Sequence, residues 1–344
     1  MQGIGSVGVT PKLQETIYQR LQQHYGITLP TTPGLDTLAC IEQAAAGKIR
    51  SAFCLGGNLY GSNPDAKFAA EAIERLDLVV YLSTTLNTGH AHGTGQETYI
   101  LPVLARDEEP EPTTQESMFN YVRMSDGGPA RHQGPLSEVQ VIATLGEALL
   151  EDRTPIDWSS MRHTGKIREM IGKVVPGYEA VAEIDRTKKE FSIPGRVLHA
   201  PRFPTSDGRA MIHLHDLPDL LGEPGELRLM TIRSEGQFNT VVYEDYDLYR
   251  GQEGRSIILI HPADLTRLRI VPDSPVTVRS ATGAMNGIIA KAYAEIREGN
   301  CAMYYPEANV LVSRQVDPDS RTPSFKNIPV RVIPEGLEAT VPIT

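Results

Sequence analysis

Residues 300–332 read NCAMYYPEANVLVSRQVDPDSRTPSFKNIPVRV, and this stretch decides the fold of the C-terminal part of the chain. It begins with a predicted strand, CAMYY, and ends with a closing strand, IPVRV. Between them lie a polar turn at residues 306–309 and a long connection rich in Asp, Ser, Thr and Arg. Such loops offer amide, hydroxyl and guanidinium donors together, which suits a phosphorylated, purine-bearing ligand. An ordinary surface loop has the same composition, so composition alone leaves both interpretations open.

The region upstream of this stretch, from Leu227 onward, consists of short apolar segments separated by turns. The predicted strands are LRLMTIR, RSIILI, SPVTVRSA, NGIIAKAYA, NCAMYY and IPVRV, with one brief helix at HPADLTRL. Many short strands with a single short helix predict a compact β-barrel.

The N-terminal part alternates between helices and strands. Helices are predicted at residues 11–24, 36–49 and 66–76, and strands at residues 51–57, 76–83 and 98–103. This alternation predicts an α/β fold, with a parallel sheet whose ligands lie beyond the carboxyl ends of the strands. Residues 107–135 are expected to be one long loop, followed by helices at residues 136–150 and 166–174.

A chain of 344 residues exceeds the usual size of a single core, so we expect two domains. The predicted boundaries are residues 1–175 for the α/β domain, 176–226 for a connecting segment, and 227–344 for the β-barrel.

Composition excludes several classes of protein. The net charge of −10 argues against a nucleic-acid or anionic-membrane partner. No apolar run reaches the roughly 20 residues needed to cross a bilayer, and residues 1–14 have neither the basic start nor the apolar core of a signal peptide. Three cysteines without a close pair argue against a disulfide scaffold, a zinc ribbon or an iron–sulfur site built from this chain. We therefore expect a cytoplasmic protein.

Other motifs carry little functional information. Residues 3–8 spell GxGxxG, but no strand precedes them, as a dinucleotide site requires. His90 with His92, and His213 with His215, are too few to form a metal site, so we interpret them as ordinary histidines. Cys54 and Cys301 lie on apolar strands and are expected to be core residues. We identify no catalytic nucleophile, so the catalytic residues are unknown.

The loop at residues 56–64, GGNLYGSNP, is a better candidate. Glycines let backbone N–H groups approach a ligand closely, and Asn58 or Asn63 adds an amide at the end of a strand. The alternative is a simple strand-to-helix turn capped by Asp65.

Taken together, these segments resemble the C-terminal half of the molybdopterin oxidoreductases of the dimethyl sulfoxide reductase superfamily, and most closely the formate dehydrogenase-like alpha subunits. SAFCLGGN, LDLVVYLS and TYILP are similar to that family's Rossmann-like third domain. MTIRSEGQFNT, HPADLTRLRIVPDSPVTVRSATG and the stretch quoted first resemble its molybdopterin dinucleotide-binding domain, a double-psi β-barrel. The resemblance covers essentially the whole chain.

The resemblance implies a cofactor, bis(molybdopterin guanine dinucleotide) with molybdenum or tungsten. It places these residues at the cofactor: Gln2, Gly3, Gly56, Asn58, Ser83, Thr84, Arg233, Glu235, Gly236, Gln237, Asn239, Asn309, Phe325 and Lys326. This chain has Leu82 and Ser83 where many relatives have an acidic residue for the guanine.

The family's iron–sulfur cysteines and metal-ligating residue have no match in this sequence. We therefore expect a fragment or split-gene subunit that holds part of the cofactor, is inactive alone, and needs an N-terminal half of the same enzyme as its partner. Its reaction is expected to be two-electron oxidoreduction of a small-molecule substrate. The alternatives are a non-catalytic molybdopterin-binding module or carrier, and a nicotinamide dehydrogenase that binds near Gly56.

Overall fold

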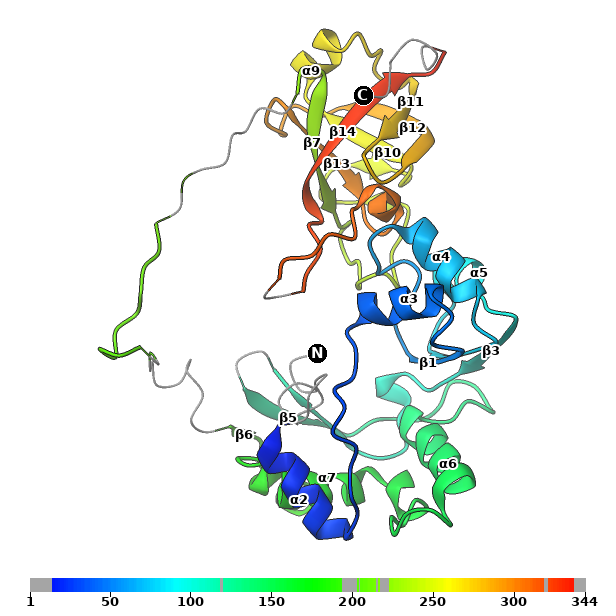
Figure 1. Ribbon diagram of the computed structural model, residues 1–344, viewed down its shortest axis with the longest axis vertical. Helices are drawn as coiled ribbons and strands as arrows, with labels where there is room; N and C mark the ends of the chain where they lie inside the picture. Colours follow the sequence, from blue (N-terminus) through cyan, green and yellow to red (C-terminus); the bar gives the residue numbers. More distant parts are fainter. Residues whose placement is uncertain are drawn as a thin grey trace. The chain divides into compact units, whose positions relative to one another are not determined.

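A computed structural model of the chain describes residues 14–117, 120–193, 203, 205–214, 216, 223–318 and 321–336. The chain forms two compact units (Figure 1). One comprises Met1–Leu35 with Leu101–His215, and the other comprises Asp36–Ile100 with Asp216–Thr344. These units divide the chain at other places than residues 175 and 226, so the domain boundaries proposed from the sequence stay predictions.

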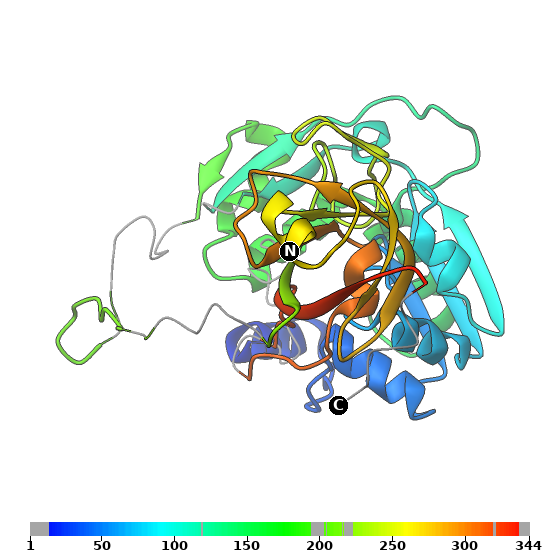
Figure 2. The same cartoon turned by 90° about the horizontal axis from the view of Figure 1, so that it is seen from above.

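The second unit contains a closed six-stranded barrel (Figures 1 and 2). Its strand order is β10-β12-β11-β14-β7-β13, with two parallel neighbours, β10 with β12 and β13 with β7. The strands are β7 (Glu226–Ile232), β10 (Ile257–Ile260), β11 (Pro275–Arg279), β12 (Ala284–Ala292), β13 (Asn300–Tyr304) and β14 (Lys326–Pro334). The predicted β-barrel is confirmed.

Alternation of side chains along the strands fills this barrel. In β7, Leu227 and Leu229 are fully buried, while Arg228 between them is not. Alternate residues of β14, Ile328, Val330 and Val332, join the same core. Successive strand residues point to opposite faces, so one face of each strand fills the interior and the other lies outside.

Short elements connect the strands at the ends of the barrel. The loop after β7, residues 233–254, contains the small hairpin β8 (Tyr246–Asp247) and β9 (Gln252–Glu253). Helix α9 (Pro262–Arg267) follows β10, as predicted. The residues after β13, predicted as a polar turn, form the 3₁₀ helix η4 (Glu307–Leu311).

The second unit also contains the predicted α/β sheet. Its strand order is β1-β2-β3. Strand β1 (Ser51–Leu55) pairs in parallel with β2 (Leu78–Ser83), and β3 (Glu97–Pro102) lies on the other side of β2. Helices α3 (Thr37–Ala45) and α4 (Ala66–Glu74) are capped by Asp36 and Asp65, whose carboxylates accept backbone N–H bonds. They share one core with Val79 and Tyr81 of β2. A short helix, α5 (Thr88–His92), lies in the loop predicted between β2 and β3.

The first unit is built around helices α2 (Glu15–Tyr25), α6 (Glu138–Leu150) and α7 (Thr164–Val174). Its shorter helices are the 3₁₀ helices η1 (Arg106–Glu108), η2 (Ser160–Arg162) and η3 (Glu179–Glu183) and the α-helix α8 (Ile184–Thr187). The expectation of one long loop over residues 107–135 is wrong. That segment contains β4 (Thr113–Glu116) and β5 (Tyr121–Ser125), which pair with β6 (Phe191–Ser192) in a small antiparallel sheet. The β4 sequence, TTQE, is polar, so it gave no apolar signal for a strand.

Candidate cofactor-binding site

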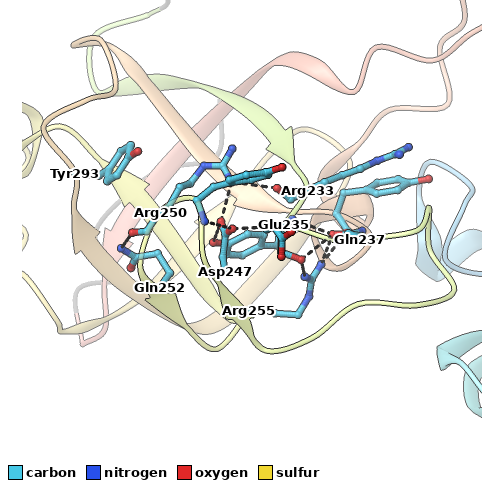
Figure 3. A network of polar contacts seen from close by, with 12 residues as sticks. Arg233, Glu235, Gln237, Asp247, Arg250, Gln252, Arg255 and Tyr293 are labelled. Atoms are coloured by element: carbon cyan, nitrogen blue, oxygen red, sulfur yellow. Dashed lines mark hydrogen bonds and ion pairs between the residues drawn. The ribbon is translucent and has the colours of Figure 1, made fainter.

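A buried carboxylate organises the 233–254 loop of the barrel (Figure 3). The carboxylate of Asp247, which is 1% exposed, accepts hydrogen bonds from the Tyr304 hydroxyl at 2.7 Å and from the Arg250 guanidinium at 2.7 Å. Its second oxygen accepts the backbone N–H groups of Glu235 and Tyr249, each at 3.1 Å. Burial alone would raise the pKa of Asp247, but its bonds with Arg250, Tyr304 and the Glu235 N–H hold that pKa below its usual value.

A buried arginine ties the same loop to the segment after β13. Arg255 is 6% exposed, and its guanidinium pairs with the Glu307 carboxylate at 2.6 Å. It also donates to the Tyr305 carbonyl at 2.7 Å and to the Ser234 hydroxyl at 3.1 Å. Its guanidinium carbon lies 4.2 Å from the centre of the Tyr243 ring. A guanidinium is tolerated in the interior only when it is paired and hydrogen-bonded in this way, so the loop and η4 are fixed together.

Gln237, predicted to contact the cofactor, has mainly intramolecular partners. Its side-chain NH₂ donates to the carbonyls of Tyr305 and Asn239, both at 2.7 Å, and its oxygen accepts the Ser234 N–H at 3.1 Å. The amide therefore shapes the loop. Three other predicted residues of this loop, Glu235, Gly236 and Asn239, are exposed.

Two cations and two aromatic rings gather beside this network. The Arg233 guanidinium lies 5.6 Å from the centre of the Tyr305 ring, which meets the Phe325 ring edge-on at 5.9 Å. The ammonium of Lys326 donates to the Thr231 carbonyl. Burial lowers the pKa of Lys326 below its usual value, and the charges of Arg233 and Arg250 lower it further. Among the residues that the structure describes, neither Arg233 nor Lys326 forms an ion pair with a carboxylate.

At the edge of the sheet, Asn58 is a buried bridge between the sheet and the barrel. Its side-chain NH₂ donates to the Thr88 hydroxyl at 2.9 Å and to the Thr240 carbonyl at 3.0 Å, and its oxygen accepts the Gly61 N–H at 2.7 Å. A Cβ at Gly61 or at Gly89 would lie within 2.7 Å of this amide. Both positions need glycine because the Asn58 side chain occupies that space.

Asn309 forms a second bridge, in which the donor belongs to the barrel and the acceptor to the sheet edge. It is fully buried in η4, and its NH₂ donates to the Gly61 carbonyl at 2.7 Å. Its side-chain oxygen has no hydrogen-bond partner among the described residues. The loops of the sheet edge and those of the barrel are therefore in direct contact through Asn58 and Asn309.

Ser83 is held by a histidine. Its hydroxyl oxygen lies 3.1 Å from Nε2 of His90, whose Nδ1 accepts the backbone N–H of Asn87 at 3.0 Å. An imidazole whose Nδ1 is an acceptor carries its proton on Nε2, so His90 donates to Ser83. Burial lowers the pKa of His90, which favours this neutral form. Thr84, the next predicted residue, is exposed, and the Gly56 N–H is used in a bond to the Leu82 carbonyl.

The remaining sequence-based expectations have mixed outcomes. Gln2, Gly3 and the GxGxxG segment lie outside the described residues. Within the described part of the chain, no three His, Cys, Asp or Glu side chains are grouped so as to hold a metal ion. Cys301 is buried and Cys54 half-buried, and burial raises the pKa of the Cys54 thiol to about 11. No helix among the described residues is long and apolar enough to span a membrane.

Sequence reasoning missed the residues that hold the site together. They are Asp247, Arg255, Tyr305 and Thr240. Asp247 and Arg255 stand alone among polar neighbours, and no pattern marks a charged residue that folding will bury. Tyr305 ends the predicted strand CAMYY, so the sequence pattern marks it only as a strand residue.

Comparison with known proteins supports the assignment of the barrel. Residues 227–329 match the family described as "Molydopterin dinucleotide binding domain". The "Uncharacterized oxidoreductase Rv2900c" of Mycobacterium tuberculosis is 32% identical over 354 residues, which is 97% of this chain and 45% of the relative. "Protein YdeP" of Escherichia coli K12 is 28% identical over 98% of this chain and 46% of its own length.

A solved structure shows the same fold. Acetylene hydratase from Pelobacter acetylenicus matches 97% of this chain and 50% of its own chain, with a TM-score of 0.62 at 13% identity. The chain thus spans about half the length of the curated relatives it matches. Residues 227–329 are similar to the molydopterin dinucleotide-binding domain family, and nearly the whole chain is similar to part of an uncharacterized oxidoreductase.

Proposed function

We propose that this chain is the part of a formate dehydrogenase-like oxidoreductase that grips bis(molybdopterin guanine dinucleotide), with molybdenum or tungsten as its metal. The observation that carries the proposal is the pair of cations Arg233 and Lys326. Both lie on segments of the matched domain, beside Tyr305 and Phe325, and neither has a carboxylate partner among the described residues.

The chemistry of these side chains fits a dinucleotide of this kind. Burial and then the neighbouring cations lower the pKa of Lys326, and a bound anion would raise that pKa. A guanidinium suits a phosphate because it can donate two parallel bonds, whereas an ammonium pairs with it as a point charge. The rings of Tyr305 and Phe325 offer apolar faces and edges to a flat heterocycle.

The other predicted residues would act at a distance from the cations. Ser83, with His90 as its donor, keeps its own hydroxyl proton for an acceptor on a ligand. The side-chain oxygen of Asn309 has no partner among the described residues, and a small rearrangement of η4 would let it accept a hydrogen bond from a ligand. Asn58 and Gln237 would preserve the relative positions of the loops.

When bound, the cofactor supplies two-electron transfer at its metal. The residues of this chain would bind and orient the cofactor and exclude water from it. We propose that the metal ligand and the iron–sulfur centres come from the half of the relatives' length that this chain does not match, as a partner subunit or as another part of one polypeptide. The activity of the isolated chain is then expected to be nil.

Cofactor binding can be tested by purifying the chain from a host that makes molybdopterin guanine dinucleotide. Acid treatment should release pterin, measured by its fluorescence, and guanosine monophosphate in equal molar amounts. Arg233→Ala and Lys326→Met should each lower the recovered pterin about tenfold, because each removes one charge-assisted contact. Arg153→Ala and Lys189→Met, which change exposed cations of the first unit, serve as matched controls.

Two results would contradict the proposal. One is the absence of pterin from wild-type protein co-expressed with the complementary half of a relative. The other is full formate-dependent dye reduction by the isolated chain, which would show that no partner is needed.

A further inference from the structure

A groove lies beside strands β11 and β14 of the barrel. Its volume is about 940 Å³, and it is bounded by β11, β14 and the segments 313–318 and 322–324. Neither Arg233 nor Lys326 lines it. The volume lies at the upper end of the range of roughly 300–1,000 Å³ that is typical of small-molecule sites.

Two arginines face each other on the strands that form this groove. Arg279 of β11 and Arg331 of β14 are direct partners in the antiparallel register, so they project from the same outer face. Like charges directly opposite on neighbouring strands destabilise a sheet. The nearest carboxylate to Arg331 is that of Glu226, at 3.8 Å, and Arg279 has no ion pair among the described residues.

The acidic residues of the groove are already engaged. Glu226 accepts the backbone N–H of Glu223 at 3.1 Å in addition to its distant contact with Arg331. Asp317 also has an interaction of its own. Among the described residues, the one carboxylate contact of the arginine pair is that of Arg331 with Glu226, at 3.8 Å.

Further donors and an apolar floor complete the groove. The hydroxyls of Thr282 and Ser313 and the side-chain amide of Gln315 line it, and none of them donates to an acceptor within the described ranges. Leu311, Ile328 and Ile333 are buried beneath.

The loop that forms one wall of the groove is fixed to the two helices of the sheet. The Arg314 guanidinium stacks on Phe68 at 3.8 Å and pairs with Asp65, the N-cap of α4, at 3.2 Å. Arg321 pairs with Asp36, the N-cap of α3, at 3.0 Å. These contacts hold the wall in place before any ligand arrives.

We propose that this groove is a second binding site, independent of the cofactor, for a small organic anion that carries a phosphate or carboxylate on an apolar body. Its charged group is held by Arg279 and Arg331, and its body lies over Leu311, Ile328 and Ile333. Binding would relieve the repulsion between the two arginines.

Isothermal titration calorimetry of the purified chain with phenyl phosphate tests this site. Arg279→Ala and Arg331→Ala should each weaken binding about tenfold, in line with the loss of one charge-assisted hydrogen bond. Arg153→Ala is the matched control. Arg233→Ala and Lys326→Met should leave this binding unchanged, so failure here is distinguishable from failure of the cofactor proposal.

Thermal melting separates a binding role from a structural one. Arg279→Ala should melt at the same temperature as wild type or higher, because it removes a repulsion and no ion pair. A lower melting temperature would mean that the arginine is structural, and it would overturn the assignment.

Three titration results would also overturn it. The first is that neither phenyl phosphate nor phenylacetate binds. The second is equal affinity for inorganic phosphate, which would indicate an adventitious ion only. The third is binding of an acidic peptide without binding of phenyl phosphate, which would make the groove a polypeptide-docking surface.

Discussion

Asn58 lies at the end of β1, where the sequence predicts an amide, and its side chain is hydrogen-bonded within the fold. The sequence placed an amide at the end of β1, and the structure has it there, 3% exposed. Its three hydrogen bonds join the sheet edge to Thr88, Gly61 and the barrel residue Thr240. An amide used so fully stabilises the fold before it can serve a ligand.

We expect Asn58→Ala to lower the free energy of unfolding by about 2–4 kcal/mol, because buried partners lose their bonds and are left unpaired. Urea unfolding followed by circular dichroism measures the loss. Gln23→Ala, which removes an exposed amide from α2, should change the free energy by about 0.5 kcal/mol or less. Equal losses in the two variants would contradict the bridging role.

His90 makes part of the stability pH-dependent. Burial lowers its folded-state pKa below the usual value of 6.5, so the neutral form is favoured by folding. The contribution is fully present above pH 6.5 and is lost as the pH falls from there through the lowered folded pKa, because protonated Nδ1 cannot accept the Asn87 N–H.

His90→Gln should remove that component of the pH dependence. Unfolding free energies measured at pH 7.5 and in steps down to pH 5 would show a smaller decrease for the variant than for wild type. His132→Gln, at an exposed position of the first unit, should keep the wild-type decrease. A profile of His90→Gln that matched wild type would refute the assignment.

At the scale of elements, periodicity predicted the regular parts well and the irregular parts poorly. The strands of the barrel and helices α3, α4 and α6 follow their apolar patterns. The polar strand β4 and the hairpin β8–β9 have no such pattern, since tertiary hydrogen bonds rather than apolar burial hold them. The same reason hid Asp247, whose partners come from β13 and from three places in its own loop.

Asp247→Asn should loosen the whole 233–254 loop. The change removes the negative charge opposite Arg250 and leaves a buried NH₂ facing the Tyr304 hydroxyl and backbone donors. Breaking a buried ion pair from one side costs about 3–5 kcal/mol. Hydrogen exchange should show reduced protection at the backbone N–H groups of Glu235 and Tyr249, which donate hydrogen bonds to the Asp247 carboxylate. Asp245→Asn, two residues away and exposed, is the matched control and should leave protection unchanged.

At the scale of the whole molecule, the second unit is discontinuous in sequence, because residues 36–100 and 216–344 belong together. Two links show why: Asn309 donates to Gly61, and the Asp65 N–H donates to the Val312 carbonyl at 2.9 Å. Single-sequence patterns carry no information on contacts this far apart. They predicted the sheet and the barrel, but not that these two segments contact each other.

The chain's single tryptophan, Trp158, offers a test of this division. It lies in the first unit, where its indole packs against Gly146 and donates to the Thr154 hydroxyl at 3.1 Å. Tryptophan fluorescence during urea unfolding therefore reports the first unit, whereas hydrogen exchange in β1, β2 and β7 reports the second. Asn58→Ala should lower protection in all three strands together and leave the fluorescence midpoint unchanged. Gly146→Ala, whose Cβ would meet the indole, should shift the fluorescence midpoint and spare the strands. If either variant moved both signals equally, the chain would unfold as one cooperative body and the two-unit description would fail.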